Sequence, residues 1–559
     1  MKLEIKNKYL IFPVNTLSTK KVLTFKINGE TVYELNIKLD NGNPNFYAYI
    51  DVSRFIGQTM DIFVAPEMKL EFREADEMNI DNLYCEPMRP QVHFTTKNGW
   101  INDPNGLVYN DGIYHMFYQY NPTEPNWDNM HWGHAVSSDL IHWEEKDVAL
   151  FPDERGCMFS GSAILDDKNL LGKNVGNNKS ILLFYTTTTP FCQHISYSTD
   201  NFETIERYID KPVVPHIKAA NRDPKVVFCD EIDCYIMALY LDEDIYCICR
   251  SDDFINWEEL QRIHLVGDNE CPDIFPLYDN EGARKWVIIG AHDKYLVGSF
   301  ENGKFTSEQS VLSLHYGTSG YAGQSFSNLP NNRIVRMVWD RWELPPFNFN
   351  GQMGIPMEMS LDKYDGYYYL QANPVEEIKG IYKNTKTYSG VFITPEATLN
   401  EMLESTAQLV KIKGESLESG EMTVSLFGRS IGFDFANNKM NIGNCTAPIS
   451  LTRSGLNITI LVDRCSIEMF ADGGKIFVSC LNNDTVSDFN IPYLIIQADR
   501  KITLENVEIN STIKDAAIAF FALAQFLIES GLSEVQVRLN LDAAIRQYKR
   551  NKRLEKEKN

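Results

Sequence analysis

The sequence has no apolar stretch long enough to cross a membrane. Its longest strongly apolar segment, residues 516–528, has thirteen residues, whereas a membrane-spanning helix needs about 20. The charged N-terminus is followed by an apolar stretch, 9–14, which is shorter than a signal-peptide core and contains Pro13. The sequence therefore predicts no membrane span, no membrane partner and a cytoplasmic location.

Cysteine pairs with the spacing of a metal or redox motif are also missing. Eleven cysteines are scattered irregularly, and the two closest, Cys247 and Cys249, lack the two-residue gap of such motifs. His131 and His134 have no third ligand at a suitable spacing. We therefore expect reduced thiols, no metal and no cofactor, and we assign the two histidines to packing.

The sequence has fewer basic than acidic residues. The chain has 53 Lys and Arg against 76 Asp and Glu, a formal net charge of −23, and no basic face stands out before the last dozen residues. A polyanion would be repelled, so nucleic acid is not expected as a partner. Aromatic side chains are plentiful, at 12% of the residues, and beside Asp and Asn they provide the chemistry that binds neutral sugars.

The chain is longer than a single hydrophobic core usually supports, which predicts more than one domain. Its apolar and polar residues follow patterns that predict strands. Residues 1–86 alternate apolar and polar positions, with Asn28-Gly29 as a hairpin turn, which predicts a small β accessory domain. Residues 87–385 repeat a Ser-Asp segment whose marker aspartates, spaced by 61 and 53 residues, are Asp139, Asp200 and Asp253. This spacing is typical of four-stranded propeller blades, and about 300 residues predict five of them.

Three acids in this region stand beside prolines, in Asp103-Pro104, Asp223-Pro224 and Glu270-Cys271-Pro272. Proline fits an innermost blade strand only near its start. Acids at such starts would converge on the central channel, where glycosidic cleavage needs one carboxylate to attack and another group to donate a proton. Taken singly, each acid has the alternative of an ordinary turn or surface residue.

The same segments carry a resemblance to a known family. Asn102-Asp103-Pro104-Asn105-Gly106, Arg222-Asp223-Pro224 and Glu270-Cys271-Pro272-Asp273 resemble the ordered motifs of glycoside hydrolase family 32, which includes invertases, levanases and inulinases. The resemblance implies that Asp103 is an ionised nucleophile forming a covalent fructosyl-enzyme. Glu270 is then the acid/base, with a raised pKa.

The resemblance further implies that Asp223 stabilises the transition state through the fructose hydroxyls, while Arg222 keeps Asp223 ionised. Cys271 is interpreted as a packed neighbour of Glu270. The implied substrate-binding residues are Trp100, Asn102, Gln119, Trp127, Phe159, Ser160, Arg222, Tyr321 and Trp339. Tyr321 and Trp339 belong to segments that depart from the family pattern and are expected on the leaving-group side.

Beyond the repeat region, residues 386–511 again predict strands, and 461–474 resemble the signature of the family's C-terminal β-sandwich. The last residues change to a helical period with a capping box. The expected fold is all-β: an N-terminal β accessory domain (1–86), a five-bladed β-propeller catalytic domain (87–385), a β-sandwich (386–511) and a short helical tail (512–559). The first domain and the tail offer surfaces for a homo-oligomer.

The predicted function is hydrolysis that releases fructose from a β-fructoside: sucrose, a fructo-oligosaccharide, or a fructan such as levan or inulin. The extra N-terminal domain favours oligosaccharide or fructan. Two alternatives stay open. A fructosyltransferase would use the same carboxylates, with a sugar instead of water resolving the intermediate, and a non-catalytic fructan-binding propeller should lack at least one of the three acids.

Overall fold

The computed structural model describes residues 1–80, 83–84, 86, 88–341, 348–415, 417–449, 455–481 and 492–512. The chain forms two compact units, a first made of Met1–Arg89 with His93–Glu377 and a second made of Pro90–Val92 with Ile378–Asn559. The predicted helical tail, apart from Thr512, lies outside the described residues. Within the described ranges, no helix has the length and apolar character that a bilayer crossing requires.

Two small sheets begin the first unit and share one apolar core. Their orders are β1-β6-β3-β4 and β5-β2-β7. At the predicted hairpin, Asn28 and Gly29 both adopt left-handed φ, 54° and 89°, as a tight turn between twisted strands requires. The elements are β1 (Lys2–Glu4), β2 (Tyr9–Val14), β3 (Lys21–Ile27), β4 (Glu30–Ile37), β5 (Phe46–Asp51), the 3-10 helix η1 (Ser53–Phe55), β6 (Thr59–Ala65) and β7 (Arg73–Ala75).

Five further sheets follow as the blades of a propeller. The first two blades contain β8 (Gly99–Asn110), β9 (Ile113–Asn121), β10 (His131–Ser137) and β11 (Glu144–Glu145), then β12 (Met158–Leu165), β13 (Ile181–Thr188), β14 (Phe191–Ser198) and β15 (Glu206–Arg207). The third contains β16 (Arg222–Cys229), β17 (Cys234–Asp242), β18 (Ile245–Ser251) and β19 (Glu258–His264).

The fourth and fifth blades have extra short strands. The fourth contains β20 (Asp273–Tyr278), β21 (Arg284–Ile289), β22 (Lys294–Glu301), β23 (Lys304–Ser307) and β24 (Leu312–Ser313). The fifth contains β25 (Gly320–Ser325), β26 (Val335–Asp340), β28 (Gln352–Met353), β29 (Met357–Tyr364) and β30 (Tyr367–Pro374), with the 3-10 helix η2 (Pro330–Asn332) after β25.

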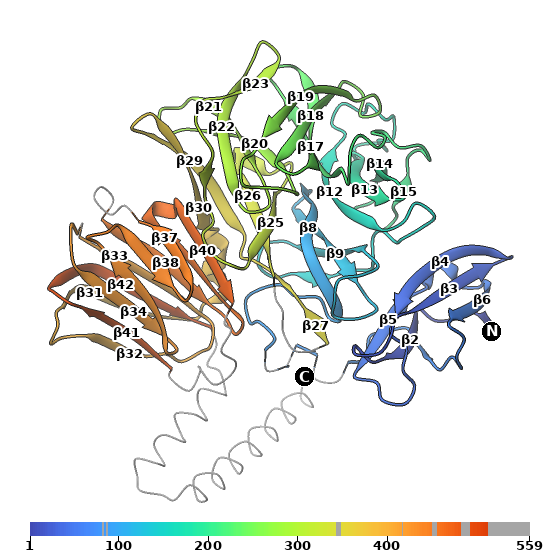
Figure 1. The fold of residues 1–559 in the computed structure, drawn as a ribbon, viewed down its shortest axis with the longest axis horizontal. Coiled ribbons are helices and arrows are strands. Elements are labelled where there is room, and N and C mark those ends of the chain that lie inside the picture. The colour runs from blue at the N-terminus through green and yellow to red at the C-terminus, as the bar shows by residue number, and fades with distance from the viewer. Residues whose placement is uncertain are drawn as a thin grey trace, which may run out of the picture. The chain divides into compact units, whose positions relative to one another are not determined.

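The first strand of each blade lies at the centre of the propeller (Figure 1). β8 contacts β12, β12 contacts β16, β16 contacts β20, β20 contacts β25, and β25 contacts β8 again, so the ring is closed. A short strand, β27 (Phe349–Asn350), pairs in parallel with β8 and joins the chain after β26 back to the first blade. Side chains at the starts of these five inner strands are therefore brought to one place.

The Ser-Asp repeat marks the turn between the third and fourth strands of the first three blades. Asp253, after β18, accepts hydrogen bonds from the backbone N–H groups of Ile255 and Asn256 at 2.9 and 2.8 Å. Asp139, after β10, bonds its own neighbours in the same way. The aspartate thus supplies the acceptor that the turning backbone lacks, which explains why this residue recurs.

Large apolar side chains fill the space between blades. Phe117 and Trp132 of the first blade pack against Leu183 and Tyr185 of the second, and all four are buried. Gly106, on β8, has a left-handed φ of 51°, and a Cβ there would lie 2.8 Å from the Phe117 ring. The glycine of the Asn-Asp-Pro-Asn-Gly motif is therefore required by blade packing.

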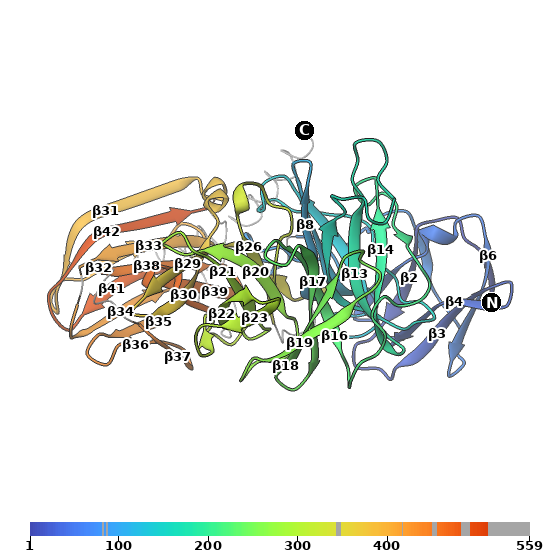
Figure 2. The same cartoon turned by 90° about the horizontal axis from the view of Figure 1, so that it is seen from above.

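The second unit contains two six-stranded antiparallel sheets (Figures 1 and 2). One consists of β31 (Asn384–Ile393), β42 (Ile502–Ser511), β33 (Gln408–Gly414), β38 (Leu456–Val462), β39 (Ser466–Ala471) and β40 (Ile476–Leu481). The other consists of β32 (Leu399–Met402), β41 (Tyr493–Ala498), β34 (Glu421–Leu426), β35 (Arg429–Asp434), β36 (Lys439–Ile442) and β37 (Cys445–Pro448). The remaining 3-10 helices are η3 (Glu376–Ile381) and η4 (Asp472–Gly474).

The segment 461–474 forms the hairpin from β38 through β39 to η4. Asp463, in its turn, accepts from the backbone N–H groups of Gln91 and Val92 at 2.9 and 2.8 Å, which ties 90–92 into the second unit. The all-β class, the propeller and the β-sandwich are thus confirmed. The boundaries of the four predicted domains stay predictions.

Candidate active site

The three acids lie where the inner strands of three blades begin. Asp103 lies in β8 where the register with β9 shifts between Ile101 and Pro104. Asp223 lies in β16 at a similar shift, and Glu270 stands three residues before β20. β-Bulges of this kind re-aim side chains out of the regular alternation, and the charges of Asp103 and Glu270 both act on Asp223, so the three carboxyl groups share one environment.

Asp103 is held by its neighbours through both carboxylate oxygens. Its Oδ2 accepts from the Ser160 hydroxyl at 2.7 Å, and its Oδ1 accepts from the Asn102 amide at 3.1 Å. Asn102 in turn accepts from the Trp100 indole N–H at 2.8 Å. Three of the predicted binding residues therefore orient Asp103, directly or through one another.

Asp223 meets Asp103 across the thiol of Cys271. The Cys271 Sγ lies 3.4 Å from Asp103 Oδ2 and 3.5 Å from Asp223 Oδ2. The backbone N–H of Cys271 also donates to Asp223 Oδ2 at 3.0 Å. Cys271 is therefore packed beside Glu270, as expected, but it also contacts both aspartates, a role that its position next to Glu270 only hints at.

Glu270 is fixed by two donors. The Arg222 guanidinium donates to Oε1 at 2.5 Å, and the Tyr321 hydroxyl donates to Oε2 at 2.6 Å. The Nε of Arg222 also lies 3.6 Å from Asp223 Oδ2. One guanidinium thus spans two of the three acids, whereas the sequence motif implied a role at Asp223 alone.

The backbone around these acids is strained. Asp223, Glu270 and Cys271 have left-handed φ values of 66°, 56° and 39°. Residues other than Gly, Asn and Asp rarely adopt this region, so the strain lies at Glu270 and Cys271. The Tyr246 hydroxyl donates to the Glu270 carbonyl at 3.1 Å, and the Thr186 hydroxyl accepts from the Asp223 backbone N–H at 3.0 Å. These bonds hold a conformation that a regular strand would not supply. Neither Tyr246 nor Thr186 carries a sequence signal for this role.

Burial dominates the electrostatics of both aspartates. It raises the pKa of Asp103, against hydrogen bonds from Ser160 and Asn102 that lower it. Burial also raises the pKa of Asp223 to about 7, with Arg222 opposing the rise and the charges of Asp103 and Glu270 adding to it. Arg222 acts in the predicted direction on Asp223, but burial outweighs it.

A substitution at Asp223 therefore has a predictable effect on stability. The Asp223 pKa is raised in the folded state, so its charge destabilises the fold fully above pH 7, and this cost shrinks as the pH falls from about 7 towards 3.8. We expect Asp223→Asn to raise Tm by a few degrees at pH 8 and to have little effect at pH 4. Asparagine suits the left-handed φ of this position.

Thermal unfolding of the two proteins at pH 4, 6 and 8 measures this effect. A difference in Tm that grows from pH 4 to pH 8 is expected. A variant that is less stable than the wild type at pH 8, or a difference independent of pH, would contradict the burial argument.

Aromatic side chains lie beside these acids, because Trp100 bonds the neighbour of Asp103 and Tyr321 bonds Glu270. Trp100 and Trp339 meet edge-on with ring centroids 5.6 Å apart, and Tyr321 lies 6.4 Å from Trp339. Arg341 covers the Tyr321 ring at 4.3 Å. A pocket at the two aspartates, next to Glu270 in the chain through Cys271, is lined by Asp103, Pro104, Ser160, Gly161, Asp223, Cys271, Pro272, Ala322, Gly323 and Gln324. Gln324, on the bulge of β25, was not singled out from the sequence.

The other predicted binding residues lie on the first two blades. Gln119 is buried and donates to the Met158 carbonyl at 2.9 Å. Trp127 is 54% exposed, and its ring meets the edge of Phe159 at 6.0 Å. Phe159 immediately precedes Ser160, the β12 residue that donates to Asp103.

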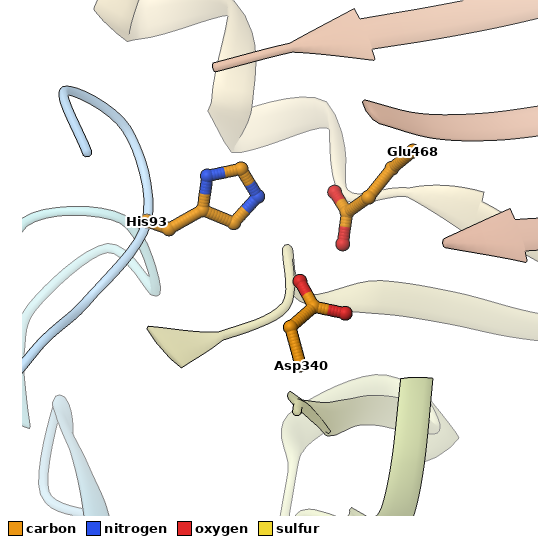
Figure 3. Close-up of side chains that lie close together, drawn as sticks. All are labelled: His93, Asp340 and Glu468. Carbon is orange, nitrogen blue, oxygen red and sulfur yellow. The ribbon is translucent and has the colours of Figure 1, made fainter. Parts of the chain in front are cut away.

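The histidines considered for a metal have other partners. His131 bonds the Tyr33 hydroxyl, and His134 stacks on Phe117 with centroids 4.4 Å apart. Figure 3 labels two further buried side chains of the first unit that carry ligand atoms, His93 and Asp340. Neither unit alone brings three such side chains together among its described residues.

Comparison with known proteins places this site in a family. The sequence model of the glycosyl hydrolases family 32 N-terminal domain matches residues 93–373. A levanase from Bacillus subtilis (strain 168) is 32% identical over 448 residues, which cover 70% of this chain and 66% of the levanase. An extracellular exo-inulinase from Aspergillus awamori is 28% identical over 478 residues, covering 70% of this chain and 89% of that protein.

Solved structures share the fold. The exo-inulinase of Aspergillus awamori superposes with a TM-score of 0.67 at 24% identity, covering 77% of this chain and 99% of that one. A fructofuranosidase from Schwanniomyces occidentalis complexed with fructose gives 0.68 at 22% identity, covering 78% and 100%. With the family model matched across the whole propeller and the acids gathered at its centre, the chain belongs to glycoside hydrolase family 32.

Proposed function

We propose that this protein is a retaining β-fructosidase that releases fructose through a covalent fructosyl-enzyme. The observation that carries the proposal is the network that links Asp103, Asp223 and Glu270, in which the Cys271 thiol contacts both aspartates and Arg222 spans Asp223 and Glu270. Retaining cleavage of a glycoside needs one carboxylate nucleophile and one acid/base.

In the first step, Asp103 attacks the anomeric C2 of fructose while Glu270 protonates the departing oxygen. The C2–oxygen bond breaks as the C2–carboxylate bond forms. Ser160 and Asn102 hold Asp103 in place for the attack. The crowded negative charge of the pocket favours a ring that becomes positive, so the transition state is stabilised more than the substrate.

In the second step, the deprotonated Glu270 takes a proton from water, which attacks C2 and frees Asp103. Tyr321 and Arg222 orient Glu270 in both steps. Asp223 accepts hydrogen bonds from fructose hydroxyls, and it needs to be ionised for this, because a carboxylate is a stronger acceptor than a carboxylic acid.

The substrates we propose are fructo-oligosaccharides or fructan, with sucrose as a further substrate. Relatives named levanase and exo-inulinase support this range, and Trp100, Tyr321 and Trp339 provide an aromatic surface beside Glu270 for a leaving sugar. A cytoplasmic location and self-association stay predictions, and one of the named relatives is an extracellular enzyme.

Product analysis tests the proposal. Purified protein incubated with sucrose, inulin and levan should release free fructose, with equal glucose and fructose from sucrose. An excess of glucose with growing oligosaccharides would instead identify a fructosyltransferase. Binding of fructan without any sugar release would identify a non-catalytic propeller and overturn the proposal.

A further inference from the structure

Trp127 stands on the loop 122–130 between β9 and β10 and contacts Phe159, the residue before Ser160, which donates to Asp103. More than half of its surface is exposed, and its ring contacts Phe159 edge-on. A half-exposed indole of this kind is positioned by the backbone that carries it. The contacts of loop 122–130 therefore decide where the ring lies.

The residues after Trp127 are bound by the N-terminal β-domain. The backbone N–H of Asn36 donates to Asn129 Oδ1 at 2.8 Å, and Asn129 Nδ2 donates back to the Asn36 carbonyl at 2.8 Å. The Asn36 side chain also donates to Asp128 Oδ1 at 3.1 Å. Asn36 lies in β4, an edge strand of its sheet, so the loop occupies backbone groups that an edge strand would otherwise expose.

Two lysines of the same domain pair with acids on either side of Trp127. Lys20 Nζ lies 2.5 Å from Asp128 Oδ2. Lys38 Nζ lies 2.7 Å from Glu124 Oε2, and Glu124 is 1% exposed. The same Glu124 oxygen accepts from the Asn126 amide at 2.9 Å. Because a buried carboxylate needs a partner, the position of Asn126, next to Trp127, depends on Lys38.

The propeller also holds this loop, which limits the size of the effect. Asn121 donates to the Asn126 carbonyl at 2.8 Å, and Asn350 donates to the Pro125 carbonyl at 3.0 Å. The loop therefore keeps its general path without the N-terminal contacts. The contacts from the N-terminal domain additionally fix the position of residues 126–129 within the loop.

We propose that the N-terminal β-domain is a positioning element of the active site: through Lys20, Asn36 and Lys38 it fixes loop 122–130 and sets Trp127 against the fructosyl unit. This inference rests on the proposed function, since Trp127 has a sugar to contact only if the pocket binds one. In this proposal, the N-terminal domain contributes to substrate binding through loop 122–130 and does not itself need to contact the sugar.

The test uses the full chain with Lys20→Met and Lys38→Met combined. We expect kcat/KM for a fructo-oligosaccharide to fall about fivefold to fiftyfold, mainly through a higher KM, because Trp127 contacts the sugar in both the ground state and the transition state. When Lys38 is replaced by Arg instead of Met in this combination, most of the lost kcat/KM should be restored. The matched control is Lys69→Met, an exposed lysine of the same domain that pairs with Glu71, and it should behave as the wild type.

A double-mutant cycle separates positioning from general destabilisation. In a Trp127→Ala background, the two lysine substitutions should lower kcat/KM by less than about twofold, because the ring that the lysines position is gone. An equal fall of kcat/KM in the wild-type and Trp127→Ala backgrounds would overturn the inference. So would an unchanged KM in the folded double lysine variant. If the double variant does not fold, Asn129→Ala removes both bonds to the Asn36 backbone and is judged by the same criteria.

Hydrogen exchange distinguishes failure of this inference from failure of the proposed function. Faster exchange of the amides of 122–130 in the lysine variant, but not in Lys69→Met, is expected whether or not the protein cleaves fructosides. Unchanged exchange would overturn the positioning role. A wild-type protein that turns over no fructoside would count against the proposed function instead.

Discussion

Replacing Asp103 by asparagine should abolish turnover while leaving the fold intact. We expect kcat to fall by on the order of 10⁴-fold, because an amide cannot form the covalent bond to C2. The substituted amide keeps an oxygen that can accept from Ser160, and it removes the cost of burying a charge, which raises the pKa of Asp103 in the wild type. Tm should therefore be equal to or above that of the wild type.

The measurement is sugar release from sucrose and inulin, together with thermal unfolding. Asp252→Asn is the matched control, since Asp252 is an exposed aspartate of the third blade, and it should keep full activity. An Asp103→Asn variant that folds and retains more than about a hundredth of the wild-type kcat would exclude Asp103 as the nucleophile.

Replacing Glu270 by glutamine should have an effect that depends on the leaving group. For sucrose or a fructan, kcat/KM should fall by on the order of 10³-fold, because no acid protonates the departing sugar oxygen. An aryl fructoside, whose leaving group departs without a proton, should lose far less in the first step. The second step should then be slow, so that the fructosyl-enzyme accumulates.

Azide provides the check on this interpretation. A small anion needs no base to attack C2, so it should restore turnover of the aryl fructoside by Glu270→Gln and yield a fructosyl azide. The control is Glu259→Gln, at an exposed glutamate paired with Arg262. An equal loss for both leaving groups, without rescue by azide, would assign Glu270 a structural role.

The convergence of the three acids could be predicted from the sequence because their signals are local. Each stands one or two residues before a proline, the Ser-Asp repeat sets the blade spacing, and inner-strand starts converge in any closed propeller. The closed ring of five inner strands bears out the fold part of that prediction. The hairpin at Asn28 and Gly29 was predictable for the same reason, since its turn chemistry lies within two residues.

The contacts between blades could not be predicted in this way. Tyr321 reaches Glu270 across 51 residues of sequence, and Ser160 reaches Asp103 across 57. These pairs depend on bulges and left-handed φ values, which the sequence around Glu270 does not indicate. The pKa of Asp223 also depended on burial, a property of the packed pocket rather than of its partner Arg222.

The contact of the N-terminal domain with loop 122–130 could not be predicted, for a related reason. Nothing in the alternating pattern of β4 shows that Asn36 meets Asn129, because the two residues are 93 positions apart. The sequence could predict that a β-domain precedes the propeller. Only the packed structure indicates which propeller loop it contacts.

The most direct test of the account is to trap the covalent intermediate. Glu270→Gln is incubated with an aryl fructoside, quenched in acid, digested and analysed by peptide mass spectrometry. The account predicts one fructosyl unit attached to the peptide that contains Asp103, and on no other peptide. An adduct on a different residue, or release of the aryl alcohol with no adduct at any time, would contradict it.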